Sequence, residues 1–110
     1  MDEDEVLVNA YKNSTDDFLA IVKKIVLAGL RPYKTKVYLF GSRATGDAMP
    51  GSDVDIGVEP LESLPAGVLS SIRENLEEST VPYTVDLIDL EQASKTFKNN
   101  VINNGKKWTS

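Results

Sequence analysis

The sequence contains neither cysteine nor histidine among its 110 residues. Without cysteine there is no disulfide, no thiolate nucleophile and no cysteine zinc site. Without histidine, histidine-dependent triads, imidazole metal ligands and the most common general base are excluded as well. Any chemistry must therefore depend on carboxylates, hydroxyl groups, lysine and arginine. A mechanism in which carboxylates hold a metal ion satisfies that restriction.

The chain also lacks a long hydrophobic run and an excess of positive charge. No apolar run could span a bilayer, and the acidic start has the wrong charge for a secretory signal, so we expect a cytoplasmic protein without membrane contact. The net charge is −5, whereas proteins that grip a nucleic-acid backbone usually carry a basic stripe. The scattered lysine pairs are interpreted as solvated surface. This balance, and the short length, argue against a protein that holds a DNA template.

The length predicts one domain with a modest core. We expect residues 1–13 to form an acidic tail and residues 14–110 to form the folded domain. Val6, Leu7, Ala10 and Tyr11 have helical spacing, so the tail could also supply a turn or two that docks on a partner.

The most informative stretch is residues 39–59, which read LFGSRATGDAMPGSDVDIGVE. An apolar run at residues 37–40 predicts a strand, and Gly41 and Ser42 end it. A glycine there lets the backbone approach a ligand without a Cβ in the way. Arg43 and the hydroxyl and N–H groups that follow are suited to a polyphosphate. The alternatives are that Ser42 only caps the turn and that Arg43 pairs with Asp47 on the surface.

Three acids complete the candidate site. Asp53 and Asp55 share one face of a predicted strand, because side chains alternate across a strand. Two such carboxylates about 4 Å apart repel by on the order of 4 kcal/mol at an effective dielectric near 20. A dication relieves that repulsion, and oxygen ligands favour Mg²⁺ or Mn²⁺. Asp86 lies in a later apolar run and joins them if the two strands are adjacent, although it could instead be a buried acid paired with Lys36.

Spacing and turn signals predict the other elements. A helix between the second and third strands suits a crossover connection, which implies parallel pairing. Trp108 is expected at the edge of the core, with a partner contact as the alternative. The predicted elements are a helix that begins at Ser14 and is capped at its end by Gly29, strands at 36–40, 53–59 and 83–88, and a helix at 65–78 with Pro65 at its first position. Asp89 is expected to cap a last helix that ends before Gly105, and the alternative is that Ser94 restarts it as a second helix.

The motif GSRATG, the ten-residue spacing to Asp53, the run Ser-Asp-Val-Asp-Ile and the later Val-Asp-Leu resemble the minimal nucleotidyltransferase (MNT) family. This family is the small core of the DNA polymerase beta-like superfamily, and the resemblance covers about residues 15–104. It implies an α/β (α+β) fold with a small mixed sheet flanked by helices. Thr45 is a departure, since close relatives usually carry a second arginine there, and its loss removes a cation near the phosphates.

The resemblance also implies residue roles. Asp53 and Asp55 would hold two Mg²⁺ ions, and Asp86 would complete the catalytic metal site and help to deprotonate the acceptor hydroxyl. The cofactor-binding set would be Gly41, Ser42 and Arg43 around the terminal phosphates of ATP.

The implied reaction moves AMP from ATP to a hydroxyl acceptor and releases pyrophosphate. The family implies a separate HEPN-domain toxin, encoded by a neighbouring gene, as partner. A tyrosine of that toxin would accept the AMP, so that this chain would be the antitoxin. Two alternatives stay open: a non-catalytic module that neutralises its partner by covering it, and a small-molecule nucleotidyltransferase of the antibiotic-modifying type. Assembly with itself or with the partner is also left open.

Overall fold

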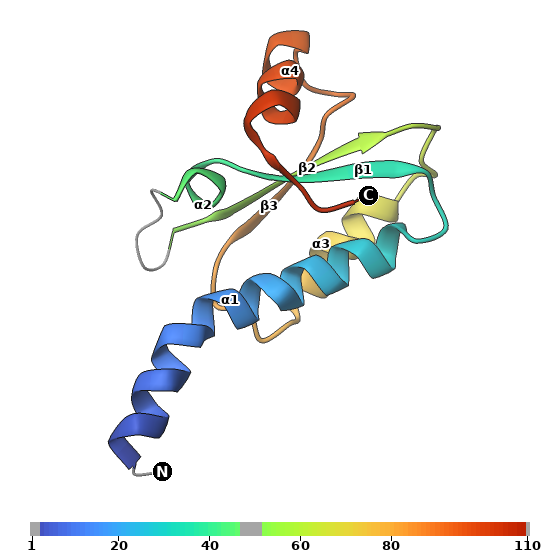
Figure 1. The fold of residues 1–110 in the computed structure, drawn as a ribbon. Coiled ribbons are helices and arrows are strands. Elements are labelled where there is room, and N and C mark those ends of the chain that lie inside the picture. The colour runs from blue at the N-terminus through green and yellow to red at the C-terminus, as the bar shows by residue number, and fades with distance from the viewer. Residues whose placement is uncertain (1–2, 47–51, 110) are drawn as a thin grey trace.

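The computed structural model describes residues 3–46 and 52–109, with side chains described from Asp17 onward. Within these residues a four-stranded mixed sheet has the order β3-β2-β1-β4 (Figure 1). Strand β1 (Thr35–Phe40) is antiparallel to β2 (Val54–Pro60) and to the short β4 (Lys106–Lys107), and β3 (Val85–Asp89) is parallel to β2. The predicted α/β class with a mixed sheet is confirmed.

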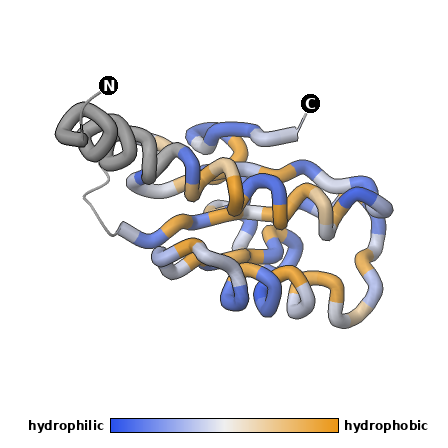
Figure 2. Tube along the Cα trace, turned by 90° about the horizontal axis from the view of Figure 1, so that it is seen from below, coloured by the Kyte–Doolittle hydropathy of each residue, from blue (hydrophilic) through white to orange (hydrophobic). Residues whose placement is uncertain are grey.

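Helices cover both faces of this sheet. Helices α1 (Glu3–Leu30) and α3 (Val68–Glu77) lie on one face, and α4 (Lys95–Asn104) lies on the other (Figure 1). The single turn α2 (Ser42–Thr45) connects β1 toward β2. Figure 2 shows hydrophobic residues recurring along the coloured part of α1, along α3 and along the strands. That pattern is expected of elements that bury one face.

The alternation of side chains along the strands divides the core into two clusters. Val37 and Leu39 of β1 pack with α1 and α3, whereas Tyr38 packs with Leu90 and Val101 beneath α4. Ile56 of β2 belongs to the first cluster. Asp55, its neighbour, therefore faces the α4 side of the sheet.

Helix α1 differs from the sequence prediction. We expected a helix to begin at Ser14, but one helix runs from Glu3 to Leu30 and crosses residue 13 without a break. The helical spacing in residues 6–11 continues the pattern, and acids at the first positions suit the positive end of a helix dipole. The docking interpretation of residues 6–11 concerns side chains outside the described part of the chain.

The end of α1 also has a different cause from the one predicted. Gly29 was expected as a cap after the helix, but it lies within α1, directly against α3. A Cβ at Gly29 would lie 2.5 Å from Ile72 Cγ1. The glycine therefore allows close packing of two helices, and Pro32 lies just beyond the end of α1.

This packing gives a test. We expect Gly29→Ala to lower the free energy of unfolding by about 1–3 kcal/mol, because overpacking outweighs the gain of about 1 kcal/mol in helix propensity. Chemical denaturation checks it. Combining the change with Ile72→Ala, which removes the colliding atoms, should cost less than the sum of the two single changes. Strict additivity of the two would show that the contact with Ile72 is not the cause.

The later elements agree with the sequence in kind and differ in their limits. Helix α3 begins at Val68 after Gly67, whose φ is +88°, so the prediction of Pro65 as the first helical residue was wrong. The last helix begins after Ser94, whose Oγ accepts a hydrogen bond from Phe97 N at 3.1 Å. Asp89 Oδ1 instead accepts one from Glu91 N at 2.9 Å, which stabilises the turn before it.

The C-terminal segment contains a strand that the sequence did not reveal. The pairs of β4 with β1 are Tyr38 with Lys107 and Leu39 with Lys106. Two lysines carry no strand signal of their own, so the pairing depends on tertiary contacts. Trp108 packs at the edge of the larger core cluster, as predicted, and its backbone N–H donates to Val37 O at 2.7 Å.

Candidate active site

A glycine-bounded turn follows β1. Gly41 has φ +75° and ψ −155°, and Gly46 closes the turn with φ +84°. The N–H groups of Ala44 and Thr45 both donate to Gly41 O, at 3.1 and 3.2 Å. The Gly41 conformation is close to exclusive to glycine, so this position in the sequence is fixed by the backbone.

The turn lies directly against an acid of β2. A Cβ built on Gly41 would lie 2.5 Å from Asp55 Oδ2, and Phe40 is paired with Asp55 in the sheet. The predicted bend and the predicted carboxylate therefore touch. This contact is the second reason for glycine at position 41, because any side chain would displace the carboxylate.

The parallel pairing of β2 and β3 brings two predicted acids side by side. Asp55 is paired with Asp86, as the crossover argument predicted. Asp53 is exposed and lies one residue before β2, and Asp86 is exposed as well. The alternative of a buried Asp86 paired with Lys36 was wrong, since Lys36 is paired with Glu59 at the other end of β2.

The pKa of the Asp55 carboxyl is consistent with Asp53 and Asp86 lying nearby. Burial raises the pKa of the Asp55 carboxyl above its ordinary value of 3.8, and the negative charges of Asp86 and Asp53 raise it further. Both effects disfavour the ionised form. A cation at this place would remove the repulsion.

This raised pKa predicts a pH dependence of stability in metal-free buffer. An acid whose pKa is higher in the folded state binds its proton more tightly there, so its contribution to stability is present at low pH. That contribution is lost as pH rises from about 3.8 through the raised pKa of Asp55. The melting temperature of Asp55→Asn should match that of the unchanged protein near pH 4 and exceed it near pH 7. A difference independent of pH would contradict the assigned charge repulsion.

The three acids do not form a ready-made metal site. In residues 3–46 and 52–109, no group of three acidic side chains is placed so that it could hold a metal ion. Because like charges repel, the exposed carboxylates of Asp53 and Asp86 are more stable when each is solvated by water than when they lie close together. The donor set still fits a hard dication, since it contains only carboxylate oxygens around one partly buried member. Convergence of Asp53, Asp55 and Asp86 on one ion stays a prediction.

Arg43 lies in a place that the sequence did not reveal. Its Nη2 donates to Ser52 O at 2.6 Å, and its Cζ lies 4.4 Å from the centroid of the Tyr83 ring. The predicted contact with phosphates stays a prediction, and Asp47, the alternative partner, lies outside the described residues. Thr45 Oγ1 donates to Ser42 O at 3.3 Å, so the residue that departs from the family pattern stabilises the turn.

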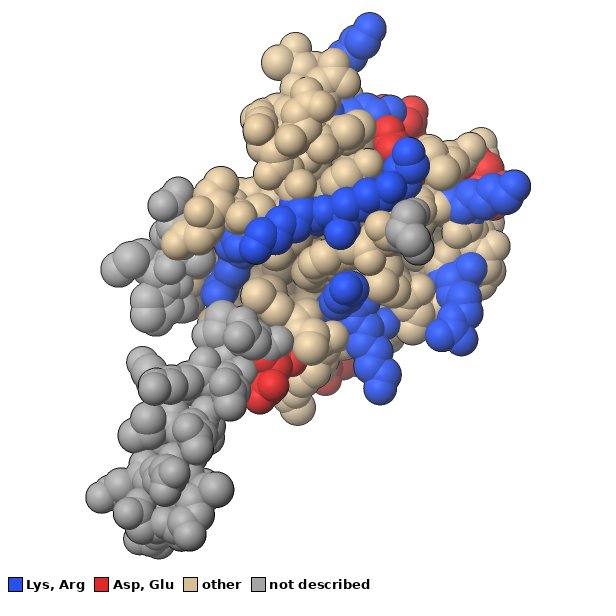
Figure 3. All heavy atoms as spheres, in the orientation of Figure 1, with Lys and Arg blue, Asp and Glu red and all other residues tan. Residues whose placement is uncertain are grey.

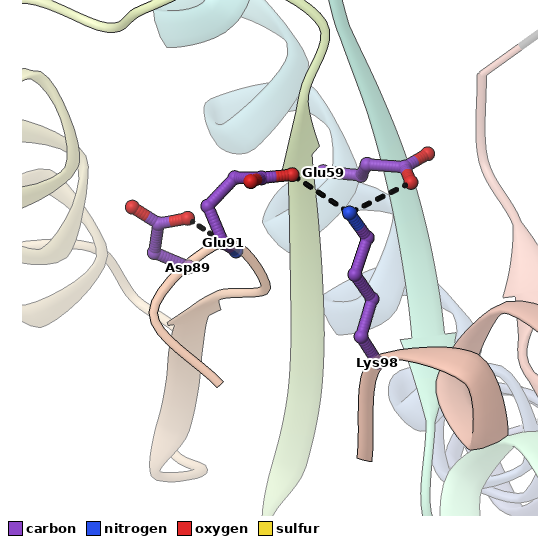
Figure 4. Close-up of polar contacts among 4 residues, drawn as sticks. All are labelled: Glu59, Asp89, Glu91 and Lys98. Carbon is purple, nitrogen blue, oxygen red and sulfur yellow. Dashed lines mark hydrogen bonds and ion pairs between the residues drawn. The ribbon is translucent and has the colours of Figure 1, made fainter. Parts of the chain in front are cut away.

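An ion-pair cluster lies on the same face of the sheet as Asp55, at the opposite end of β2 (Figure 4). Lys98 Nζ of α4 lies 2.7 Å from Glu91 Oε1 and 3.5 Å from Glu59 Oε2. The hydrogen bond to Glu91 is the largest effect that raises the pKa of Lys98. Glu59 is four residues from Asp55, which is about 13 Å along a strand. Helix α4 thus forms an ion pair with the end of β2 that is opposite Asp55.

The fold also aligns basic side chains that look scattered in the sequence. Figure 3 shows a band of lysine and arginine side chains across the face where β4 joins β1. Lys106 and Lys107, which make up β4, are both exposed.

No helix of the described residues has the length and apolar character needed to cross a membrane.

Comparison with known proteins decides the family. The family model described as "Polymerase beta, Nucleotidyltransferase" matches residues 31–109, which include the turn and all three acids. The chain belongs to this nucleotidyltransferase family. The resemblance inferred from GSRATG and the spaced acids is thereby confirmed.

Individual relatives of this nucleotidyltransferase narrow the resemblance to MNT proteins. The chain is 40% identical over 80 residues to the probable protein adenylyltransferase MntA of Haemophilus influenzae, covering 73% of this chain and 68% of that protein. A toxin–antitoxin crystal structure with AMP-PNP matches with TM-score 0.63 and 28% identity, covering 80% of this chain and 73% of the other. The complex of a tri-AMPylated Shewanella oneidensis HEPN toxin with its MNT antitoxin matches with TM-score 0.58 and 26% identity, covering 83% and 71%.

Proposed function

We propose that this nucleotidyltransferase moves AMP from ATP to a tyrosine hydroxyl of a HEPN-domain toxin and thereby acts as its antitoxin. The observation that carries the proposal is the contact of the Gly41 backbone with the Asp55 carboxylate, on a strand where Asp55 adjoins Asp86. A nucleotide bound at the turn would have its phosphates next to the acids. The AMP-modified HEPN toxin in complex with an MNT antitoxin supports the choice of a HEPN toxin as the acceptor protein.

The proposed reaction joins the acceptor oxygen to the α-phosphorus and breaks the bond from that phosphorus to the β-phosphate oxygen. Pyrophosphate leaves, and the acceptor proton passes to a carboxylate. Asp53, Asp55 and Asp86 would hold the Mg²⁺ ions, which when bound offset charge on the attacking and leaving oxygens. Asp86 is exposed, so its carboxylate is accessible to an incoming hydroxyl. Ser42 and the Gly41 backbone would bind the terminal phosphates.

The direct test uses both proteins. The chain, a HEPN-domain toxin as the proposed partner and ATP labelled on the α-phosphate are incubated with Mg²⁺, and the partner is analysed by intact mass and peptide mapping. We expect the label on a tyrosine of the partner and none with EDTA or with ATP labelled on the γ-phosphate. Label confined to this chain, or transfer that is insensitive to EDTA, would refute the proposal.

A non-catalytic antitoxin is the second candidate, and the orientation of Arg43 favours it. The guanidinium contacts Ser52 and Tyr83, and position 45 carries threonine in place of a second arginine. If neutralisation needs only the complex, Asp55→Asn should protect cells from the toxin as well as the unchanged chain does. If AMP transfer is required, that variant should bind the toxin and fail to protect.

A further inference from the structure

Arg43 is the side chain that connects the separate segments of the candidate site. It lies two residues after Gly41, in α2. Its Nη2 donates to the carbonyl oxygen of Ser52, the residue directly before Asp53, at 2.6 Å. Its guanidinium carbon lies 4.4 Å from the centroid of the Tyr83 ring, three residues before Asp86. One side chain therefore contacts the segments on which two of the three acids lie, and itself belongs to the third segment, the turn.

The geometry is specific to arginine. The planar guanidinium can stack on a ring and donate at its edge at the same time, which a lysine ammonium does not reproduce. A hydrogen bond from a charged donor is about twice as strong as a neutral one, and a cation over an aromatic ring adds about 0.5–2 kcal/mol. Arg43 Nε is buried and has no hydrogen-bond partner among residues 3–46 and 52–109. Leaving that group unsatisfied costs free energy, so the side chain keeps this position only because its other contacts outweigh the cost.

The aromatic partner is itself fixed to the body of the protein. The rings of Tyr83 and Phe18 meet edge to face, with centroids 5.8 Å apart. Phe18 belongs to α1, whose neighbouring residue Leu19 packs on the larger core cluster. Arg43 is thus held against a ring that the long helix supports.

We propose that Arg43 is a positioning residue, which with Tyr83 keeps the segments bearing Asp53 and Asp86 near Asp55, so that a divalent cation can draw the carboxylates together when it binds. This role deepens the proposed function. It rests on that function only where AMP transfer is measured, because Mn²⁺ binding and hydrogen exchange can be measured without it. Like charges at Asp53, Asp55 and Asp86 push their segments apart. The hydrogen bond from Arg43 acts on the backbone of Ser52, beside Asp53, and the contact with the Tyr83 ring acts on the segment that leads to Asp86. Both contacts oppose that separation. In this role the Arg43 guanidinium contacts Ser52 and Tyr83 and does not bind the nucleotide phosphates.

The test compares four variants by Mn²⁺ titration with electron paramagnetic resonance. Arg43→Lys and Tyr83→Leu each remove the stacked contact, and we expect each to weaken Mn²⁺ affinity about 10-fold, the factor that corresponds to about 1.4 kcal/mol. Tyr83→Phe keeps the ring and should stay within about 2-fold of the unchanged protein. Arg31→Lys is the control, since Arg31 is exposed just after α1 and precedes the end of β1 that is opposite Asp55. It should leave Mn²⁺ affinity unchanged whatever its effect on stability.

Two further readouts separate the possible outcomes. Hydrogen–deuterium exchange should rise at peptides spanning 52–55 and 83–86 in Arg43→Lys and Tyr83→Leu, with or without metal. In AMP transfer, kcat should fall about 10-fold while KM for ATP changes less than about 2-fold.

The inference would be overturned if Arg43→Lys raises KM for ATP while Tyr83→Leu leaves Mn²⁺ affinity and hydrogen–deuterium exchange unchanged. That result would make Arg43 a phosphate ligand. If the unchanged chain transfers no AMP but the Mn²⁺ and exchange results hold, the proposed function fails and the positioning role stands.

Discussion

Asp55→Asn should abolish AMP transfer and make the protein more stable. The amide cannot supply the charge that a dication needs, so we expect a loss of at least ~1,000-fold in kcat/KM, equivalent to about 4 kcal/mol of transition-state stabilisation. The same change removes a carboxyl whose pKa is raised by burial and by two neighbouring acids. The melting temperature at pH 7 without metal should therefore rise by about 2–5 °C, which is under about 1 kcal/mol for a domain of this size.

The matched control for this prediction is Glu74→Gln. Glu74 is an exposed acid of α3, so its replacement removes the same formal charge at a place remote from the site. It should alter neither transfer nor melting temperature appreciably. Scanning calorimetry measures the melting temperatures of the two variants, and a transfer assay measures their activity. If Asp55→Asn lowers the melting temperature, the carboxylate is stabilising, and the assignment of a strained acid cluster is incorrect.

Gly41→Ala should also inactivate the protein, through geometry and without any change of charge. The backbone conformation of Gly41 costs a residue with a Cβ about 1–3 kcal/mol. The new Cβ would also lie 2.5 Å from Asp55 Oδ2, so the carboxylate must move. A misplacement of about 1 Å at a reacting centre costs about 100-fold in rate, and we expect a loss of at least that size.

The neighbouring glycine separates the two causes. Gly46 also has positive φ, +84°, but a Cβ there would meet nothing within 4 Å. Gly46→Ala should destabilise the protein by about 1 kcal/mol from backbone strain and reduce transfer less than about 5-fold. Equal losses of activity in the two variants would show that turn strain, and not contact with Asp55, governs the site.

Patterns local in sequence predicted the parts of this structure that depend on local chemistry. The alternation of Asp53 and Asp55 with apolar residues, and the crossover between β2 and β3, were enough to predict that Asp55 lies beside Asp86. The glycine after β1 was predicted to allow close approach, and the contact with Asp55 shows what approaches it.

What the sequence could not predict depends on contacts between distant segments. Arg43 meets Tyr83, forty positions later, and no periodicity signals that pairing. Lys106 and Lys107 form a strand only because β1 offers a free edge to them. Gly29 looked like a helix cap, because the requirement for a small residue comes from Ile72 of another helix. Ser14 had the right residue type to begin a helix, yet the helical pattern on both sides of it prevailed.

The most direct measurement is a crystal structure of the chain with Mn²⁺ and a non-hydrolysable ATP analogue, using anomalous scattering to locate the metal. We predict metal density between the carboxylates of Asp55 and Asp86, and the terminal phosphates against the backbone of Gly41 and Ser42. A nucleotide bound away from this turn, or metal density remote from both acids, would contradict the assignment of this end of the sheet as the site of AMP transfer.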